Sequence, residues 1–178
     1  MYKKLFLLCA FSALFISCKM ENPFMKESGL QYGAPEFDKI SIEHYLPAFE
    51  AGIAEGKANI DRIVENTEEP TFANVIAPME FASPILDRVS GVFYNLLEAD
   101  TNDQMQELAE KISPMMTEYS MYISLNAKLF EKIKKVYDNR AAAGLKPNEL
   151  RLLEQTYRSF ARNGANLNDE DKKKYAEL

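Results

Sequence analysis

The chain has 178 residues, of which 47% are hydrophobic and 27% charged, and its formal net charge at pH 7 is −6. These proportions are typical of one soluble domain with an ordinary core, and they exclude a disordered or fibrous chain. A negatively charged surface repels phosphate backbones, so we expect no nucleic acid partner. The sequence shows no strand-like alternation, internal repeat or low-complexity tract. The residues therefore predict an all-α fold with short connections.

The first 17 residues have the pattern of a secretory signal. A basic start, Lys3 and Lys4, precedes a predominantly apolar run over residues 5–16. This run is too short for a membrane-spanning helix, which needs about 20 apolar residues to cross ~30 Å of hydrocarbon. We expect residues 1–17 to be a lipoprotein-type signal peptide, and the protein to be exported to the cell envelope as a periplasmic or outer membrane lipoprotein.

Cys18 follows this run directly. The tetrapeptide FISC resembles the lipobox that bacterial lipoprotein processing recognises, although Phe15 stands where that motif usually has Leu. We expect lipidation of Cys18, which makes the membrane a partner through a lipid anchor, because two or more acyl chains hold a protein durably on a bilayer. A plain signal peptide with an incidental cysteine is the alternative. Removal of residues 1–17 also removes Cys9, so no internal disulfide remains possible.

An irregular arm is predicted to precede the helices. Residues 18–37 are rich in Pro, Gly and polar side chains, so we assign them to the anchor and this arm, and residues 38–178 to a helical lobe. The first helix of that lobe is predicted from about 43 to 65, because its apolar residues recur at spacings of three, four and seven. Pro47 fits this helix only in its first turn, where the missing N–H is not needed.

A second helix is predicted from Thr71, a suitable cap, to about Asp100. Pro78 and Pro84 fall inside its apolar pattern. Each proline removes a backbone hydrogen bond and crowds the preceding turn. We therefore expect either a kink or two shorter helices.

Three more helices follow from capping residues and apolar spacing. The first begins at Thr101 or Asn102 and contains Pro114, which predicts a bend. The next covers the apolar positions of 129–137, and the last has its buried side over 150–160. Gly144 is expected to close the helix over 129–137. Pro147 is expected to open the last of the three helices, and Gly164 to end it.

A final helix start is predicted at Asn168, with Asp169, Glu170 and Asp171 in the first turn, where carboxylates meet the positive end of the helix dipole. Leu178 follows without a terminating Gly or Pro. This pattern indicates a truncated chain, with a frayed natural terminus as the alternative.

His44 is the only histidine of the chain, and it is the natural first candidate for a catalytic residue. A zinc site of the HExxH type needs two imidazoles one helical turn apart, which one histidine cannot supply. No Gly-x-Ser-x-Gly elbow is present to make His44 the base of a serine nucleophile. We therefore expect His44 to lie at a helix start, packed near Tyr45 or hydrogen-bonded to the backbone. No catalytic and no metal-binding residue is predicted in this chain.

The carboxylate and methionine clusters are also expected to be structural. Glu68 and Glu69 lie in a connector, and the segment EADTND at 98–103 lacks the spacing of a calcium loop. Methionines at helical spacing are expected in the core rather than in an open groove. These are Met79, Met105, Met115, Met116 and Met121.

Several long segments, in order, carry a family resemblance. They are NPF, APEFDKISIEHYLPAFEAGIAEG, EEPTFANVI, LDRVSGVFYNLLEADTND, LNAKLFEKIKKVYDNR and LRLLEQTYRSFARNGANLNDEDKKK. Together they cover nearly all of residues 21–178, and they resemble the amino-terminal region of peptidyl-dipeptidases of the Dcp type, in the thimet oligopeptidase family of zinc metallopeptidases.

This resemblance implies a mostly helical enzyme with two lobes around a deep channel, of which residues 38–178 form part of the amino-terminal lobe. It implies zinc as the cofactor of the full-length enzyme, held by residues far downstream, and short peptides as substrates, from whose carboxyl ends dipeptides are removed. No metal ligand or catalytic residue of the family has a counterpart in this chain. A stand-alone, lipid-anchored peptide-binding module without activity is the alternative.

Overall fold

The fold is all-α in the part of the chain that the computed structural model describes, residues 21–165, 167, 170–171 and 174. No strand occurs among these residues, which confirms the predicted fold class. The main elements are α1 (Ile42–Glu65), the wide helical turn η4 (Phe72–Ile76), α2 (Ala77–Glu80), α3 (Pro84–Ala99), α4 (Asp103–Ser124), α5 (Ala127–Asp138) and α6 (Pro147–Arg162).

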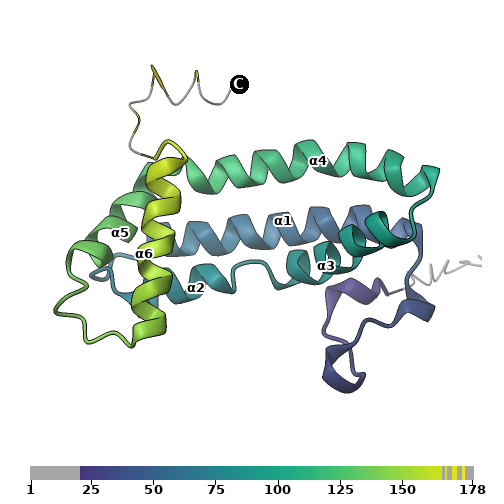
Figure 1. Ribbon diagram of the computed structural model, residues 1–178, viewed down its shortest axis with the longest axis horizontal. Helices are drawn as coiled ribbons and strands as arrows, with labels where there is room; N and C mark the ends of the chain where they lie inside the picture. The colour runs from purple at the N-terminus through teal and green to yellow at the C-terminus, as the bar shows by residue number, and fades with distance from the viewer. Residues whose placement is uncertain (1–20, 166, 168–169, 172–173, 175–178) are drawn as a thin grey trace, which may run out of the picture.

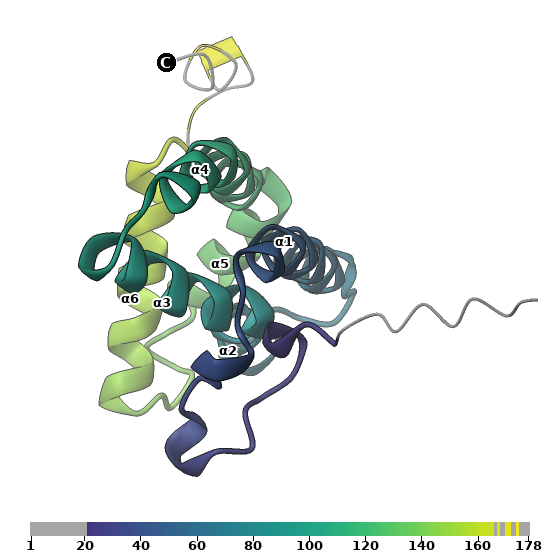
Figure 2. The same cartoon turned by 90° about the vertical axis from the view of Figure 1, so that its right-hand side faces the viewer.

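The long helices form an up-and-down bundle. In Figure 1, α1, the α2–α3 pair and α4 run side by side in alternating directions, while α6 crosses them at one end of the molecule. Helix α1 packs on both α3 and α4, and α5 packs on α6. Residues 21–40, the arm, lie at the other end, beside α3 and the start of α1 (Figures 1 and 2).

Helix α1 confirms the predicted element, but its proline lies deeper than expected. Pro47 is the sixth residue of the helix that begins at Ile42, so it sits beyond the first turn. Its missing N–H leaves the carbonyl of Glu43 without the usual helical partner. The helix nevertheless continues to Glu65, because its apolar face is buried from Tyr45 to Ile63.

The predicted interruption between Pro78 and Pro84 is present as a break between α2 and α3. Each proline occupies one of the first two positions of its helix, where no intrahelical N–H is needed. Thr71 caps the segment as predicted: its Oγ1 accepts from Asn74 N–H at 3.2 Å, and Thr71 N–H donates to Asn74 Oδ1 at 2.7 Å. Two shorter helices are therefore the correct alternative.

Capping chemistry also sets the start of α4 and of α5. Asn102 Oδ1 accepts from Met105 N–H, and Asn126 Oδ1 accepts from Leu129 N–H, each at 3.0 Å. Asn102, rather than Thr101, is thus the cap of α4. Pro114 lies inside this helix.

The turn between α5 and α6 corrects one boundary. Helix α5 ends at Asp138, and Gly144 lies six residues later, in the turn that follows, with φ +63°. Its left-handed backbone suits glycine, as expected, but it does not close the helix. Pro147 opens α6, and Gly164, with φ +87°, follows its last residue, Arg162, both as predicted.

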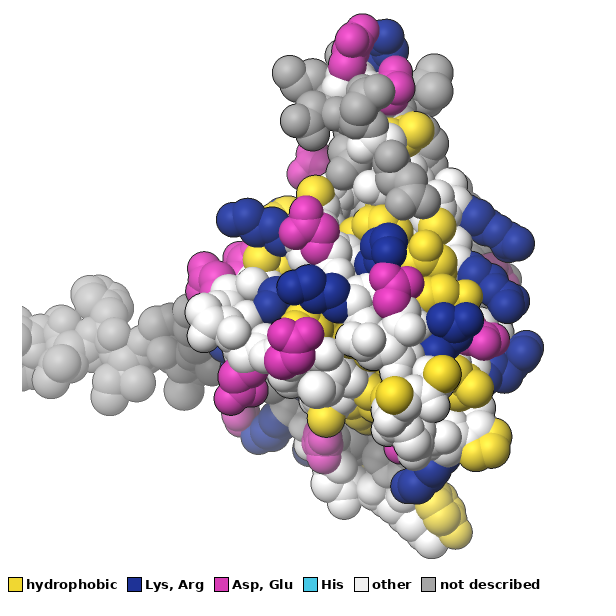
Figure 3. All heavy atoms as spheres, turned by 90° about the vertical axis from the view of Figure 1, so that its left-hand side faces the viewer, with side chains coloured by type: hydrophobic (Ala, Val, Ile, Leu, Met, Phe, Trp, Pro, Cys, Tyr) yellow, Lys and Arg dark blue, Asp and Glu magenta, His cyan; other side chains and the backbone are white. Residues whose placement is uncertain are grey.

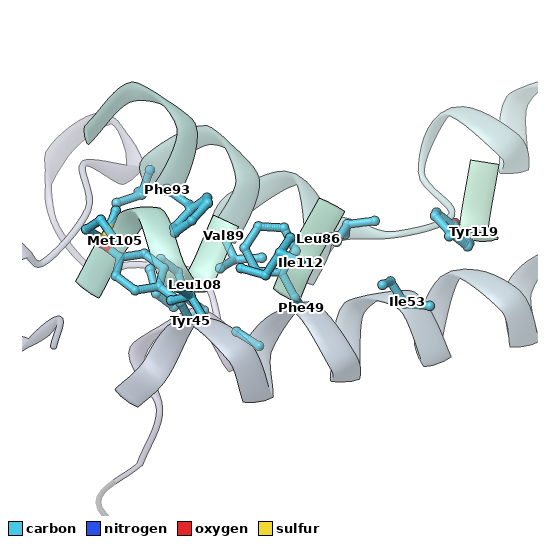
Figure 4. Packing of buried hydrophobic residues seen from close by; sticks show 13 residues of the cluster. Tyr45, Phe49, Ile53, Leu86, Val89, Phe93, Met105, Leu108, Ile112 and Tyr119 are labelled. Carbon is cyan, nitrogen blue, oxygen red and sulfur yellow. The ribbon is translucent and has the colours of Figure 1, made fainter. Parts of the chain in front are cut away.

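The core consists of two clusters of buried side chains. The first joins the arm, the first half of α1, α3 and α4; Phe49 and Phe93 lie at its centre with ring centroids 5.4 Å apart in an edge-to-face arrangement (Figure 4). The second joins the last half of α1, η4, α5 and α6, and it includes Ile60, Ile76, Leu129, Ile133 and Leu153, each at most 1% exposed. The molecule therefore has an arm end and an α5–α6 end.

Candidate functional site

His44 is a structural residue at the start of α1. Its side chain is 6% exposed, and its Nδ1 accepts a hydrogen bond from Ser41 N–H at 3.1 Å, with Ser41 Oγ at 3.0 Å. An acceptor at Nδ1 places the proton of the neutral ring on Nε2. The carbonyl of His44 accepts from Asn22 Nδ2 at 2.7 Å, which ties the arm to the helix. The predicted role of His44 at a helix start is confirmed.

The other sequence candidates lie where a structural role explains them. Glu68 and Glu69 are exposed in the α1–η4 connector, and Glu98, Asp100 and Asp103 are exposed around the α3–α4 turn. Of the methionines, Met105 is buried, and Met79, Met115 and Met116 pack against the two core clusters. Met121 is half-buried, so these five described methionines form no open groove of their own.

The described residues do not offer a fit for zinc. Within the described ranges, no three His, Cys, Asp or Glu side chains lie close enough together to hold a metal ion. The single imidazole is already used at Nδ1 by the helix start.

Several predicted features lie outside the described residues. They are the signal peptide at 1–17, the proposed lipidation site Cys18, and, near the other end, the predicted cap Asn168 with Asp169 in the first turn. Among the residues that are described, no helix has the length and apolar character to cross a bilayer. The domain boundaries at 17 and 37 and the lipid anchor stay predictions.

A buried polar contact lies where the two core clusters meet, and no local sequence pattern indicates it. Ser83, in the break before α3, and Tyr119, on α4, are 8% and 7% exposed, and their hydroxyl oxygens are 2.6 Å apart. Burial raises the pKa of the Tyr119 hydroxyl, so it stays protonated as a hydrogen-bonding group. Asn59 Nδ2 donates to Ala82 O at 2.6 Å, and Ile85 N–H donates to Glu55 Oε2 at 3.2 Å. The break is thus held by α1 and α4 together.

A second polar contact joins the outer sides of α1 and α4. The hydroxyl of Tyr122 donates a short hydrogen bond to Asp61 Oδ1. This bond to a carboxylate, with some burial, raises the pKa of Tyr122 to about 12. Both groups are at the surface of the bundle, where Lys57 Nζ also lies over the Tyr122 ring, 5.3 Å from its centroid, and we assign these contacts to helix packing.

A groove lies between the arm and α3. It has a volume of about 470 Å³, and its walls are mainly apolar. The arm contributes Phe24, Pro35, Phe37 and Ile40, and α3 contributes Val92, Leu96 and Ala99. The short helical turns η1 (Pro23–Met25), η2 (Gln31–Gly33) and η3 (Phe37–Lys39) shape the arm side.

The arm is fixed to the bundle at one end of this groove. Phe24 is 3% exposed, with its ring centroid 5.3 Å from that of Tyr45, and its carbonyl accepts from Arg88 Nε at 3.0 Å. The other charged lining groups are paired within the arm: Lys26 with Glu21 at 2.8 Å and Lys39 with Glu36 at 2.6 Å. The groove therefore offers an apolar contact surface rather than a charged site, and it holds no nucleophile and base in contact.

A second hollow lies at the opposite end of the molecule, between η4 and the α5–α6 turn, with a volume of about 550 Å³. Figure 3 shows this end, where hydrophobic side chains alternate with charged side chains of both signs. Its lining includes Phe72, Val136 and Leu145, with Glu69 and Glu149 at its edge. This hollow is likewise without a catalytic arrangement.

Comparisons with known proteins agree with a helical peptidase lobe. The family model described as Neurolysin/Thimet oligopeptidase, N-terminal domain, matches residues 50–172. The chain belongs to this family. It is 39% identical to the dipeptidyl carboxypeptidase of Escherichia coli over 153 residues, and 37% identical to that of Salmonella typhimurium over 151 residues. It is 24% identical to oligopeptidase A of Escherichia coli over 159 residues.

These matches cover most of the chain but a small part of each relative. The matches to the two dipeptidyl carboxypeptidases cover 86% and 85% of this chain, and 22% of each relative's length. The match to oligopeptidase A covers 89% of this chain and 23% of the relative's length. The chain thus spans about a fifth of the length of the relatives that it matches. The resemblance inferred from the sequence segments is confirmed.

Proposed function

We propose that this chain is the amino-terminal helical portion of an exported peptidyl-dipeptidase-like zinc metallopeptidase. The complete enzyme would remove dipeptides from the carboxyl ends of short peptides. This portion would help to cover the substrate channel, which restricts entry to unstructured peptides. The chain alone is proposed to be inactive.

One observation carries this proposal: 39% identity to a dipeptidyl carboxypeptidase over 86% of the chain, together with a match to a family model for an N-terminal domain. The geometry is compatible with a covering role, because the described residues form a helical body whose polar contacts, such as Ser83 Oγ to Tyr119 OH and Asn59 Nδ2 to Ala82 O, join helices to one another. In the complete enzyme, a bound zinc ion would activate the water that attacks the peptide bond. The residues that hold zinc are proposed to lie downstream.

The reading frame of the gene tests this proposal. We expect the nucleotide sequence beyond codon 178 to encode an HExxH motif and a further glutamate on the carboxyl-terminal side. A stop codon at position 179, with no such motif in the following frame, would contradict the proposed downstream portion.

We further propose that residues 1–17 are removed on export and that Cys18 carries the lipid anchor in the cell envelope. Lys3, Lys4 and the apolar run that ends before Cys18 support this. Labelled palmitate fed to cells that express the chain should appear in the protein, and Cys18→Ser should abolish the label. Label retained in the Cys18→Ser variant would refute lipidation at this residue.

The alternative function is a stand-alone, lipid-anchored module that binds peptides without cleaving them. The apolar groove between the arm and α3 is the observation that favours it. Under this alternative, purified residues 19–178 fold cooperatively and bind short peptides in isothermal titration. A cooperatively folded protein without peptide binding would exclude the alternative.

A further inference from the structure

We propose that the exposed side of the arm is the surface on which the downstream portion of the same polypeptide packs. This inference rests on the proposed function. The surface, named here the arm surface, consists of Leu30, Tyr32 and Phe37 together with the groove between the arm and α3.

Large apolar side chains gather on the arm. Tyr32 is 96% exposed, Phe37 57% and Leu30 49%. Met25, also in the arm, is 37% exposed. Outside the arm, the other exposed large hydrophobic side chains among the described residues are Phe81 at the α2–α3 break, Tyr94 on α3, and Leu167. Exposed apolar side chains gathered on one part of a surface mark an interaction site, whereas those scattered singly are ordinary.

Tyr32 adds a second, independent observation. It is the only described residue other than glycine with a positive φ, at 60°, and it precedes Gly33 at 66°. A left-handed conformation is unfavourable for a bulky residue and persists where the surroundings determine it. Within the described residues, Tyr32 lies in a turn that is closed by a hydrogen bond from Gly33 N–H to Leu30 O. Its ring is exposed to solvent. A contact from outside would supply the missing packing.

The arm is also held in place for such a contact. Asn22 binds His44 O, Phe24 is buried against Tyr45, and Arg88 Nε binds Phe24 O. Figure 2 shows the arm projecting below α2 and α3, apart from the bundle axis. A projecting segment with a fixed base loses little conformational entropy on binding.

The downstream portion is the occupant that the observations favour. The dipeptidyl carboxypeptidases that match the chain extend well beyond it, since the match spans 22% of their length. The arm surface is mainly apolar, and the two arm charges that line its groove, Lys26 and Glu36, form ion pairs within the arm. Permanent interfaces are likewise more hydrophobic than transient ones. A lipid surface, a second copy of the chain and a peptide ligand are the competing occupants.

Hydroxyl-radical footprinting read by mass spectrometry tests the assignment. The reactivities of Tyr32 and Phe37 are compared between the 178-residue chain and the full-length polypeptide that carries it. We expect both to fall several-fold in the full-length polypeptide. Phe81, at the α2–α3 break and 78% exposed, is the matched control, and its reactivity should be similar in both.

A variant pair separates specific packing from general burial. In the full-length polypeptide, Tyr32→Ser should restore the reactivity of Phe37, whereas Phe81→Ser should leave Phe37 protected. Equal reactivity of Tyr32 in the two polypeptides would overturn the inference. So would protection of Tyr32 in the 178-residue chain by zwitterionic vesicles, by short peptides or by raised protein concentration.

The outcome also distinguishes this inference from the function on which it rests. A full-length polypeptide that releases dipeptides while Tyr32 stays reactive would overturn the packing surface alone. A reading frame without a downstream portion would remove the occupant and overturn both.

Discussion

Gly56 of α1 lies directly against the hydroxyl of Tyr119 on α4. A Cβ built at position 56 would stand 2.0 Å from the Tyr119 OH and equally close to Ser83 Oγ. Gly52, one turn earlier, faces the backbone of Leu86 in the same way, at 2.6 Å. The two glycines let the α2–α3 break and α4 approach α1 closely, so they hold the two core clusters in one body.

The first prediction concerns Gly56→Ala. The added methyl group has to displace Ser83 and Tyr119, whose hydroxyls are buried, so we expect a loss of about 1–3 kcal/mol in the free energy of unfolding. Gly91→Ala in α3 is the matched control, because its Cβ meets no atom within 4 Å. Replacing a helical glycine by alanine in open space should stabilise by about 0.5–1 kcal/mol. Urea denaturation measures both, and equal effects of the two variants would contradict the close contact.

The second prediction concerns the hydrogen bond itself. Tyr119→Phe leaves the buried Ser83 hydroxyl without its partner, which should cost about 1–3 kcal/mol. Adding Ser83→Ala to Tyr119→Phe removes the unsatisfied group, so the double variant should be more stable than the sum of the single effects. A double-mutant cycle in urea measures this coupling; a value of zero would mean that the two hydroxyls do not interact in solution.

The third prediction concerns His44. His44→Ala removes the acceptor for Ser41 N–H and part of the packing at the start of α1, and it should destabilise the chain by about 1–2 kcal/mol. His44→Gln restores an acceptor at the third helical position, as in a capping box, and should recover part of this loss. Thermal unfolding followed by circular dichroism compares the three proteins. A fully stable His44→Ala variant would mean that the imidazole has no role at the helix start.

The fourth prediction is a pH dependence at Tyr122. Its pKa is raised from 10.0 to about 12 in the fold, mainly by the hydrogen bond to Asp61. A raised pKa means that the protonated tyrosine stabilises the folded state below pH 10, and that this contribution is lost as the pH rises toward 12. The pKa values of Tyr45, Tyr94 and Tyr119 are raised as well, by burial. Only a difference between variants therefore isolates Tyr122.

Tyr122→Phe should flatten the fall in stability between pH 10 and pH 12, and Asp61→Asn should flatten it in the same window. Urea midpoints measured at several pH values over that range give the comparison. An unchanged slope in both variants would show that the Tyr122–Asp61 contact does not form in solution.

The elements that the sequence predicted correctly depend on local signals. Asn102 and Thr71 cap helices because their side chains accept hydrogen bonds from backbone N–H groups three residues away. Pro78, Pro84 and Pro147 occupy helix starts, because a helix accepts proline in its first turn more readily than in its interior. His44 acts over the same short range. The assignment of this residue to a helix start could therefore be made without a structure.

The features that escaped prediction depend on residues far apart in the chain. The Ser83–Tyr119 contact spans 36 positions, and the Arg88–Phe24 contact, which fixes the arm, spans 64. Nothing in the local pattern of Gly56 shows that a hydroxyl from another helix will lie above it. Pro47 was expected in the first turn of its helix but lies beyond it. The helix tolerates this position because burial of the α1 face outweighs one missing hydrogen bond. The groove at the arm follows from the same distant contacts.

The central claim is that this chain is the amino-terminal portion of a peptidyl-dipeptidase. The most direct measurement is mass spectrometry of a short synthetic peptide incubated, in the presence of zinc, with the full-length polypeptide and, separately, with the 178-residue chain. We expect stepwise loss of dipeptides from the carboxyl end with the full-length polypeptide and an intact peptide with the chain alone. Dipeptide release by the 178-residue chain, or an intact peptide after incubation with the folded full-length polypeptide, would show that this assignment is wrong.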